Sequence, residues 1–212
     1  PVRIAVDGCP LQDIIDIIAL NSRVPGERVG DLWAQLSANL VGIRALEDLL
    51  KRYGSKTVTS ACNALLDHAE RRFRSHIRDV PDGAFESVQW MDDDGVGGDP
   101  IEIRLVMTVE GEDILFDFTG TAPQLRTSRN VPPGATLAVV YGVLKSYFDP
   151  TLPPNSGYFR AVEVRLPDGS LLNPEPPAAV GQRAYTCQII SDVLVLALNQ
   201  AAPHLALAGS GP

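Results

Sequence analysis

The sequence has 212 residues, a formal net charge of −8 and 45% hydrophobic residues. This length is sufficient for one large domain or two small ones, and the composition is that of an ordinary globular protein. The acidic balance disfavours nucleic acid, which requires a basic footprint, and it disfavours anionic membrane surfaces.

Three cysteines lie far apart in the sequence, at Cys9, Cys62 and Cys187. An odd and scattered set fits reduced thiols in a cytoplasmic protein better than a disulfide framework. No apolar stretch is long enough to span a bilayer, and no signal peptide is visible. Because the chain begins without methionine and stops directly after an apolar segment, we expect an internal fragment of a larger enzyme subunit, incomplete as a catalyst by itself.

Residues 1–80 are predicted to be a helical region. Apolar residues at helical spacing predict a short helix over 11–20, a long helix from Pro25 to Tyr53 with Trp33 in the core, and a third helix over 55–77. The expected buried face of the third helix comprises Val58, Cys62, Leu65, Leu66, Ala69, Phe73 and Ile77. Its C-terminal half carries Arg71, Arg72, Arg74 and Arg78, which we expect to pair with Glu70 and Asp79.

Residues 81–212 are predicted to be a mixed region continuous with the first. Alternating apolar residues predict strands over 101–109 and 114–118, and a second hairpin over 162–166 and 171–172. Helical spacing returns over 136–148, and the helix over 186–202 is apolar nearly all round. This order predicts an α+β fold, with long amphipathic helices followed by antiparallel hairpins and packed helices.

Several residues that suggest a metal or nucleophilic site lack the required pattern. Aligning the acidic loop 92–99 with an EF-hand puts Trp90 and Ile101 at ligand positions, so that motif fails. The three histidines, at positions 68, 76 and 204, form no ligand pattern. Cys187 has no nearby histidine to serve as its base, so we interpret it as a buried small apolar residue.

The segment 117–124 (DFTGTAPQ) is a stronger candidate for a site. Asp117, Thr119 and Thr121 supply a carboxylate and two hydroxyls where a strand ends, which suits polar ligand binding on a rigid support. A turn in which Asp117 bonds its own backbone is an equally good interpretation. Downstream lie loop 154–160 and the proline-rich loop 173–183, whose Arg183 precedes a helix and would reinforce an anion site there.

Taken together, six runs resemble the hydantoinase B/oxoprolinase family in their order and spacing, over essentially the whole chain. They are 30–35 (GDLWAQ), 81–83, 92–95, 117–124 (DFTGTAPQ), 155–157 and 173–183. The first and fourth are the specific ones.

The resemblance implies a component of an ATP-dependent amidohydrolase that opens 5-oxoproline, a hydantoin or a related lactam. A hydantoinase A-type partner, in a hetero-oligomer, would bind ATP and phosphorylate the amide oxygen. A divalent metal would be bound by a segment outside this chain, because none of its own residues matches the family's metal segment. A ketone carboxylase subunit and a non-catalytic assembly scaffold are the alternatives.

Carried over onto this sequence, the resemblance implies that a set of polar residues lines or structures the substrate pocket, with no general base assigned. The set is Asp117, Thr119, Thr121, Gln124, Asn155, Arg160 and Arg183. The hypothesis requires that the DFTGTAPQ turn and the proline-rich loop meet in space.

Overall fold

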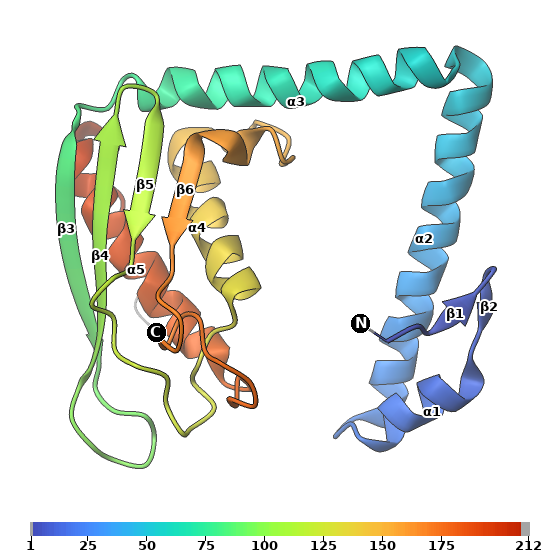
Figure 1. Cartoon of the computed structure of the whole chain (residues 1–212), viewed down its shortest axis with the longest axis horizontal. Coiled ribbons are helices and arrows are strands. Elements are labelled where there is room, and N and C mark those ends of the chain that lie inside the picture. Colours follow the sequence, from blue (N-terminus) through green and yellow to red (C-terminus); the bar gives the residue numbers. More distant parts are fainter. Residues whose placement is uncertain (1, 209–212) are drawn as a thin grey trace. The chain divides into compact units, whose positions relative to one another are not determined.

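The computed structural model describes residues 2–208 and divides into two compact units, Pro1–Asn63 and Ala64–Pro212. The first unit contains strands β1 (Ala5–Val6) and β2 (Cys9–Pro10), helices α1 (Gln12–Leu20) and α2 (Pro25–Tyr53), and the start of α3 (Ser55–Ile77) (Figure 1). The three helices have the predicted bounds to within a residue. The second half of α3 belongs with the sheet-containing unit.

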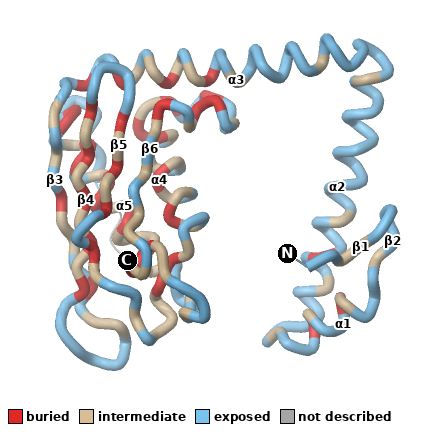
Figure 2. The backbone as a smooth tube through the Cα atoms, in the orientation of Figure 1, coloured by how far each residue is buried: buried red, intermediate tan, exposed pale blue. Residues whose placement is uncertain are grey.

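Helix α2 buries far less of its apolar surface than its sequence predicts. Among its residues only Leu32 is buried, whereas Trp33 is 43% exposed, so the prediction of a core tryptophan is wrong for this unit. Within its unit the helix is packed by α1, and most of its length is pale blue, the colour of exposed residues, in Figure 2. Further along the same helix, Ile43, Leu46, Leu49 and Tyr53 are also exposed.

The second unit is built on a four-stranded sheet in the order β3-β4-β5-β6. Its strands are β3 (Gly83–Met91), β4 (Ile101–Glu110), β5 (Asp113–Asp117) and β6 (Val162–Arg165). Strands β3, β4 and β5 pair antiparallel, and β6 pairs with β5 in parallel. The strand β3 was not predicted, whereas β4 and β5 lie where alternation placed them.

The predicted hairpin of 162–166 with 171–172 is wrong. Residues 162–165 lie along β5 instead, with Ile114 opposite Val162 and Asp117 opposite Arg165. Helix α4 (Pro133–Phe148) returns the chain to the start of β5, and that return is what permits parallel pairing. Leu171 and Leu172 are fully buried but do not form a strand. The predicted turn before them is present, with Gly169 at φ 70°.

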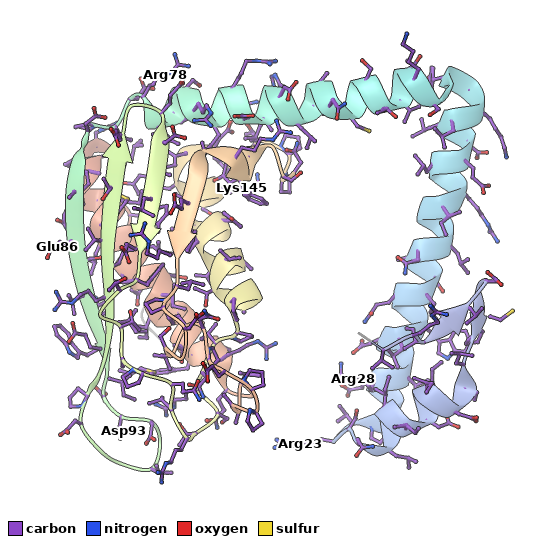
Figure 3. The ribbon with its side chains drawn as sticks, in the orientation of Figure 1. Arg23, Arg28, Arg78, Glu86, Asp93 and Lys145 are labelled. Atoms are coloured by element: carbon purple, nitrogen blue, oxygen red, sulfur yellow. The ribbon has the colours of Figure 1, made fainter. Side chains whose placement is uncertain are left out.

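Helices α4 and α5 (Arg183–Ala201) cover one face of this sheet (Figure 1). Helix α5 packs against β3 and β4, and α4 packs against α5. The inward residues of β4 are all buried and meet the apolar helices in one core; they are Ile101, Ile103, Leu105, Met107 and Val109. Both helices begin at the end of the sheet where β5 and β6 finish, and Asp93 lies at this end in Figure 3. We call it the loop end.

The second half of α3 is fixed to this unit by buried apolar residues and ion pairs. Ala69, Phe73 and Ile77 are buried as predicted, but Cys62 and Leu65 are exposed because only this half meets the core. Of the predicted arginine pairs, Arg74 with Glu70 is present at 3.0 Å. The other arginine pairs are Arg74 with Asp113, Arg72 with Asp149 and Arg78 with Glu112.

A close backbone contact also holds α3. Gly157 is buried just before the one-turn helix η1 (Tyr158–Ala161), and a Cβ added to it would lie 2.0 Å from the carbonyl oxygen of Leu66. Because that neighbour is backbone and not a flexible side chain, only glycine permits the approach.

We therefore predict that Gly157→Ala lowers the free energy of unfolding by roughly 1–3 kcal/mol, as expected when a packed site is overfilled. The matched control is Gly142→Ala on α4, where an added Cβ meets nothing within 4 Å and the gain in helix propensity is about 0.5–1 kcal/mol. Urea unfolding of both variants measures the difference. Equal stabilities would contradict the contact.

Candidate functional site

The DFTGTAPQ turn and the proline-rich loop lie side by side at the loop end, as the site hypothesis requires. The backbone N–H of Gln124 donates to the Gly169 oxygen at 2.8 Å, and its side-chain oxygen accepts from the Glu175 N–H at 2.7 Å. One step earlier, the Leu171 N–H donates to the Ala122 oxygen at 2.9 Å. Segments almost fifty residues apart in sequence are thus joined by direct hydrogen bonds.

Asp117 forms the local turn that its sequence context suggested. Its Oδ1 accepts from the Thr119 N–H at 2.9 Å, and its Oδ2 lies 2.7 Å from Nη1 of Arg165 on β6. Partial burial raises the pKa of the Asp117 carboxyl, but the Thr119 side chain and N–H and the Arg165 guanidinium outweigh it, so the pKa lies below its usual value. This carboxyl is therefore ionised at neutral pH and braces β5 against β6.

Thr121 connects the turn to β4. Its hydroxyl accepts from the Arg104 N–H at 3.2 Å and donates to the Arg104 oxygen at 3.1 Å, and only 9% of the residue is exposed. Gly120 has φ 96°, and a Cβ there would come within 2.9 Å of the Arg104 side chain. Thr121 thus holds the turn in shape, whereas Thr119 and Gln124 are exposed.

Arg183 is the first residue of α5, and its side chain points away from any strong partner. The residue is exposed, and its Nη1 makes a long hydrogen bond of 3.4 Å to the Val180 oxygen. Helix α5 has no side-chain N-cap. The Gln182 and Arg183 N–H groups donate to the Ser128 and Val180 oxygens, and the positive end of the helix dipole at this first turn favours an anion. One turn later, burial raises the pKa of the Cys187 thiol against the opposing effect of Arg183, which favours the inert thiol.

Two predicted site residues lie away from the loop end. Arg160 pairs with Asp67 and Glu70 of α3, each at 2.9 Å. The Asn155 side chain accepts from the Gly157 N–H at 2.9 Å. Both lie in the segment that leads into the start of β6, opposite the end where β6 finishes.

The residue that sequence reasoning missed at the loop end is Asn130. It is fully buried, and its amide nitrogen donates to the oxygens of Leu125, Thr127 and Ala179 at 2.9–3.0 Å. Its Oδ1 accepts from the Leu125 N–H at 2.7 Å. An asparagine preceding Val-Pro-Pro looks like an ordinary loop residue, so its sequence context carries no signal of burial.

The acidic loop 92–99 also reaches this end of the sheet, through Arg129. The Arg129 guanidinium donates to the Asp93 carbonyl oxygen and lies 5.0 Å from the ring centre of Tyr185. Asp93 and Asp94 each accept a backbone N–H two residues on, from Gly95 and Val96. Across residues 2–208, no three histidine, cysteine, aspartate or glutamate side chains gather closely enough to hold a metal ion.

These features define an α+β component with a polar loop end and an uncapped helix, and the family follows from comparison with known proteins. The model of the hydantoinase B/oxoprolinase family matches residues 1–212. The chain therefore belongs to the hydantoinase B/oxoprolinase family.

Among its relatives is caprolactamase subunit beta of Pseudomonas jessenii, 33% identical over all of this chain and 36% of that one. 5-Oxoprolinase 1 of Arabidopsis thaliana is 30% identical over 85% of this chain and 16% of its own length. The chain thus spans about a third or less of the length of these relatives.

Two solved structures share the fold. The crystal structure of the ATP-dependent caprolactamase from Pseudomonas jessenii superposes with a TM-score of 0.86 at 33% identity, over 96% of this chain and 35% of that one. An acetone carboxylase chain superposes with a TM-score of 0.78 over 96% of this chain and 29% of its own, at 14% identity, which shows the fold alone. No helix within residues 2–208 is long and apolar enough to cross a bilayer.

The bracing of Asp117 predicts how its carboxyl titrates. Because the folded pKa is depressed, the ionised carboxyl stabilises the fold above its unfolded pKa of about 4, and this stability is lost as pH falls through the lower folded value. Arg165→Gln should raise the pKa of Asp117 toward the ordinary value, as measured by carbon-detected NMR of the side-chain carboxyl. Arg78→Gln, which removes the pair with Glu112, should leave it unchanged. If Arg165→Gln leaves the pKa of Asp117 unchanged, the ion pair between Asp117 and Arg165 does not lower that pKa.

Proposed function

We propose that this chain is the part of an ATP-dependent amidohydrolase subunit that receives an activated cyclic amide, such as 5-oxoproline, a hydantoin or a related lactam. The observation that carries the proposal is the junction of the DFTGTAPQ turn with the proline-rich loop beside the uncapped start of α5. Family membership and the likeness to a caprolactamase subunit support the same class of reaction.

The chemistry explains why two components are needed. An amide carbonyl is a poor electrophile, and phosphorylation of its oxygen converts it into a group that water can attack. A hydantoinase A-type partner would bind ATP and form the activated compound, and the two would assemble as a cytoplasmic hetero-oligomer. A divalent metal, where one takes part, would be bound by a segment outside this chain.

Within this chain, we assign the anionic part of the activated compound to Arg183 and the first turn of α5. The exposed guanidinium and the positive end of the α5 dipole both favour negative charge. Fixed donors of this kind stabilise charge that develops in a transition state. Thr119 and Gln124 are exposed on the adjoining turn and would line the same pocket. Asp117 and Thr121 would hold that turn in place.

The ketone carboxylase alternative also begins by phosphorylating an oxygen of the substrate. Bicarbonate would then react with the phosphoenol, whereas in the amidohydrolase water attacks the phosphorylated amide. The assembly-scaffold alternative is favoured by one observation of its own, the exposed apolar residues of α2, among them Trp33, Ile43 and Leu46. Exposed apolar residues, where they gather into one surface, mark an interaction site. The scaffold role can coexist with chemistry at the loop end.

Arg183→Gln in the full-length subunit, assembled with its ATP-binding partner, should lower kcat about 100-fold, in line with the loss of one donor to a developing anion. The control is Arg78→Gln, which removes an exposed cation at the other end of the sheet and should leave kcat unchanged. Turnover is measured with 5-oxoproline, hydantoin, caprolactam and acetone, together with ATP hydrolysis.

The outcomes separate the three functions. Lactam or hydantoin opening that depends on Arg183 supports the proposal, and turnover of acetone alone would favour the carboxylase. Loss of the complex in size-exclusion chromatography, with the variant still folded, would favour the scaffold. Full activity of Arg183→Gln on every substrate would refute the assigned site.

A further inference from the structure

Residues 128–131 form a seam, so named here, between the two loops of the candidate site. Each of these four residues makes one hydrogen bond to the segment 171–182 or to α5. The Ser128 oxygen accepts from the Gln182 N–H at 2.8 Å, and the Val131 N–H donates to the Leu171 oxygen at 2.9 Å. The Arg129 oxygen accepts from the Thr186 hydroxyl at 2.6 Å, and the Asn130 amide donates to the Ala179 oxygen at 3.0 Å.

Hydrogen bonds, more than packing, fix these loops. Pro123 and Gln124 on one side and residues 175–177 and 181–184 on the other are exposed, so few apolar contacts hold them. The seam itself is anchored in the core, because two of its residues, Asn130 and Val131, are fully buried. A buried backbone without regular structure must find partners for its polar groups, and here the seam and its side-chain amide supply them.

The Asn130 carboxamide is suited to this position by its donors and acceptor. It bonds to its own loop at Leu125 and Thr127 and to the opposite loop at Ala179. A carboxylate of the same shape has no hydrogen to donate. In aspartate one oxygen would still accept from the Leu125 N–H, but the other would place negative charge against the three carbonyl oxygens that the amide nitrogen now serves. This side chain thus joins the two loops directly, beside the backbone hydrogen bonds of the seam.

We infer that the seam, with Asn130 at its centre, positions the groups for the reaction proposed above, holding the DFTGTAPQ turn in register with Arg183 at the start of α5. This inference rests on the proposed function. The hydrogen bonds of the Asn130 side chain go to backbone groups, so its effect on the substrate would pass through the segments that it holds. Displacing the two sides of a site by a fraction of an ångström is costly in rate, because catalysis requires oriented groups.

Two variants test the seam, and one control matches them. Asn130→Asp removes the amide donors, and Thr186→Val removes only the hydroxyl that bonds the Arg129 oxygen, with little change in volume. The control is Ser87→Ala. Like Thr186→Val, it removes a buried hydroxyl that donates to a backbone oxygen, here that of Val193 on α5 at 2.7 Å. Ser87 lies in the middle of β3, away from the loop end.

In the full-length subunit assembled with its partner, Thr186→Val and Ser87→Ala should lower Tm by similar amounts. Only Thr186→Val should lower kcat per folded enzyme for the lactam that the wild type turns over, by about tenfold. Hydrogen–deuterium exchange should show residues 119–127 and 175–183 losing protection together in Thr186→Val and neither segment doing so in Ser87→Ala. Asn130→Asp should show the same changes more strongly, and should it fail to fold, Thr186→Val decides the question.

The results distinguish this inference from the function on which it rests. If Thr186→Val and Ser87→Ala have the same kcat, or if only one of the two loops gains exchange, the seam is structural and the inference is wrong, while wild-type turnover keeps the proposed function. If the wild-type complex opens none of the cyclic amides, the proposed function fails and the inference fails with it.

Discussion

The constraint on which the second unit depends is that its sheet is buried on one face only. The inward side chains of β4, from Ile101 to Val109, are covered by α5, and its outward side chains, such as Arg104, remain half-exposed and are mostly polar. Burying the five inward residues at about 1.5–3 kcal/mol each is the largest single group of favourable contacts along any strand. Helices α4 and α5 both lie on that face, and both begin at the same end of the sheet because each follows one of the two parallel strands β5 and β6 (Figure 1).

The candidate site follows from this arrangement. With two helix starts and three strand connections at one end, long stretches of irregular backbone must satisfy their polar groups without a ladder. Asn130 and Thr121 do so from within, by bonding to carbonyl and N–H groups of neighbouring segments. The donors left over are those at the surface, at Arg183 and the first turn of α5, where a soluble anion can reach them. The buried hydrogen bonds that hold the loops and the exposed groups at the start of α5 both arise because strand connections and helix starts share one end of the sheet.

Periodicity in the sequence predicted the helices and the strands β4 and β5. An element that is buried on one face carries apolar residues at the repeat of its secondary structure, and this repeat is visible in the sequence. Periodicity missed β3, whose inward face mixes Phe85 with Ser87 and Gln89. It misjudged β6, since a turn at 167–170 is a local signal, whereas pairing with β5 depends on where α4 returns the chain. The meeting of the DFTGTAPQ turn with the proline-rich loop was predicted through the family resemblance, while the burial of Asn130 depends on contacts with Ala179 that no local pattern encodes.

The first unit presents the opposite physical situation. Its long helix α2 has a wide band of apolar residues, yet Ile43, Leu46 and Tyr53 are about half exposed. Exposed apolar area of this kind is unfavourable in water, and a helix is stabilised mainly by packing of its apolar face. In relatives that are nearly three times as long, more protein is present to cover such a face. Under the proposed function the two units would divide the work: α2 would supply surface for assembly, and the loop end of the sheet would supply the polar groups for chemistry.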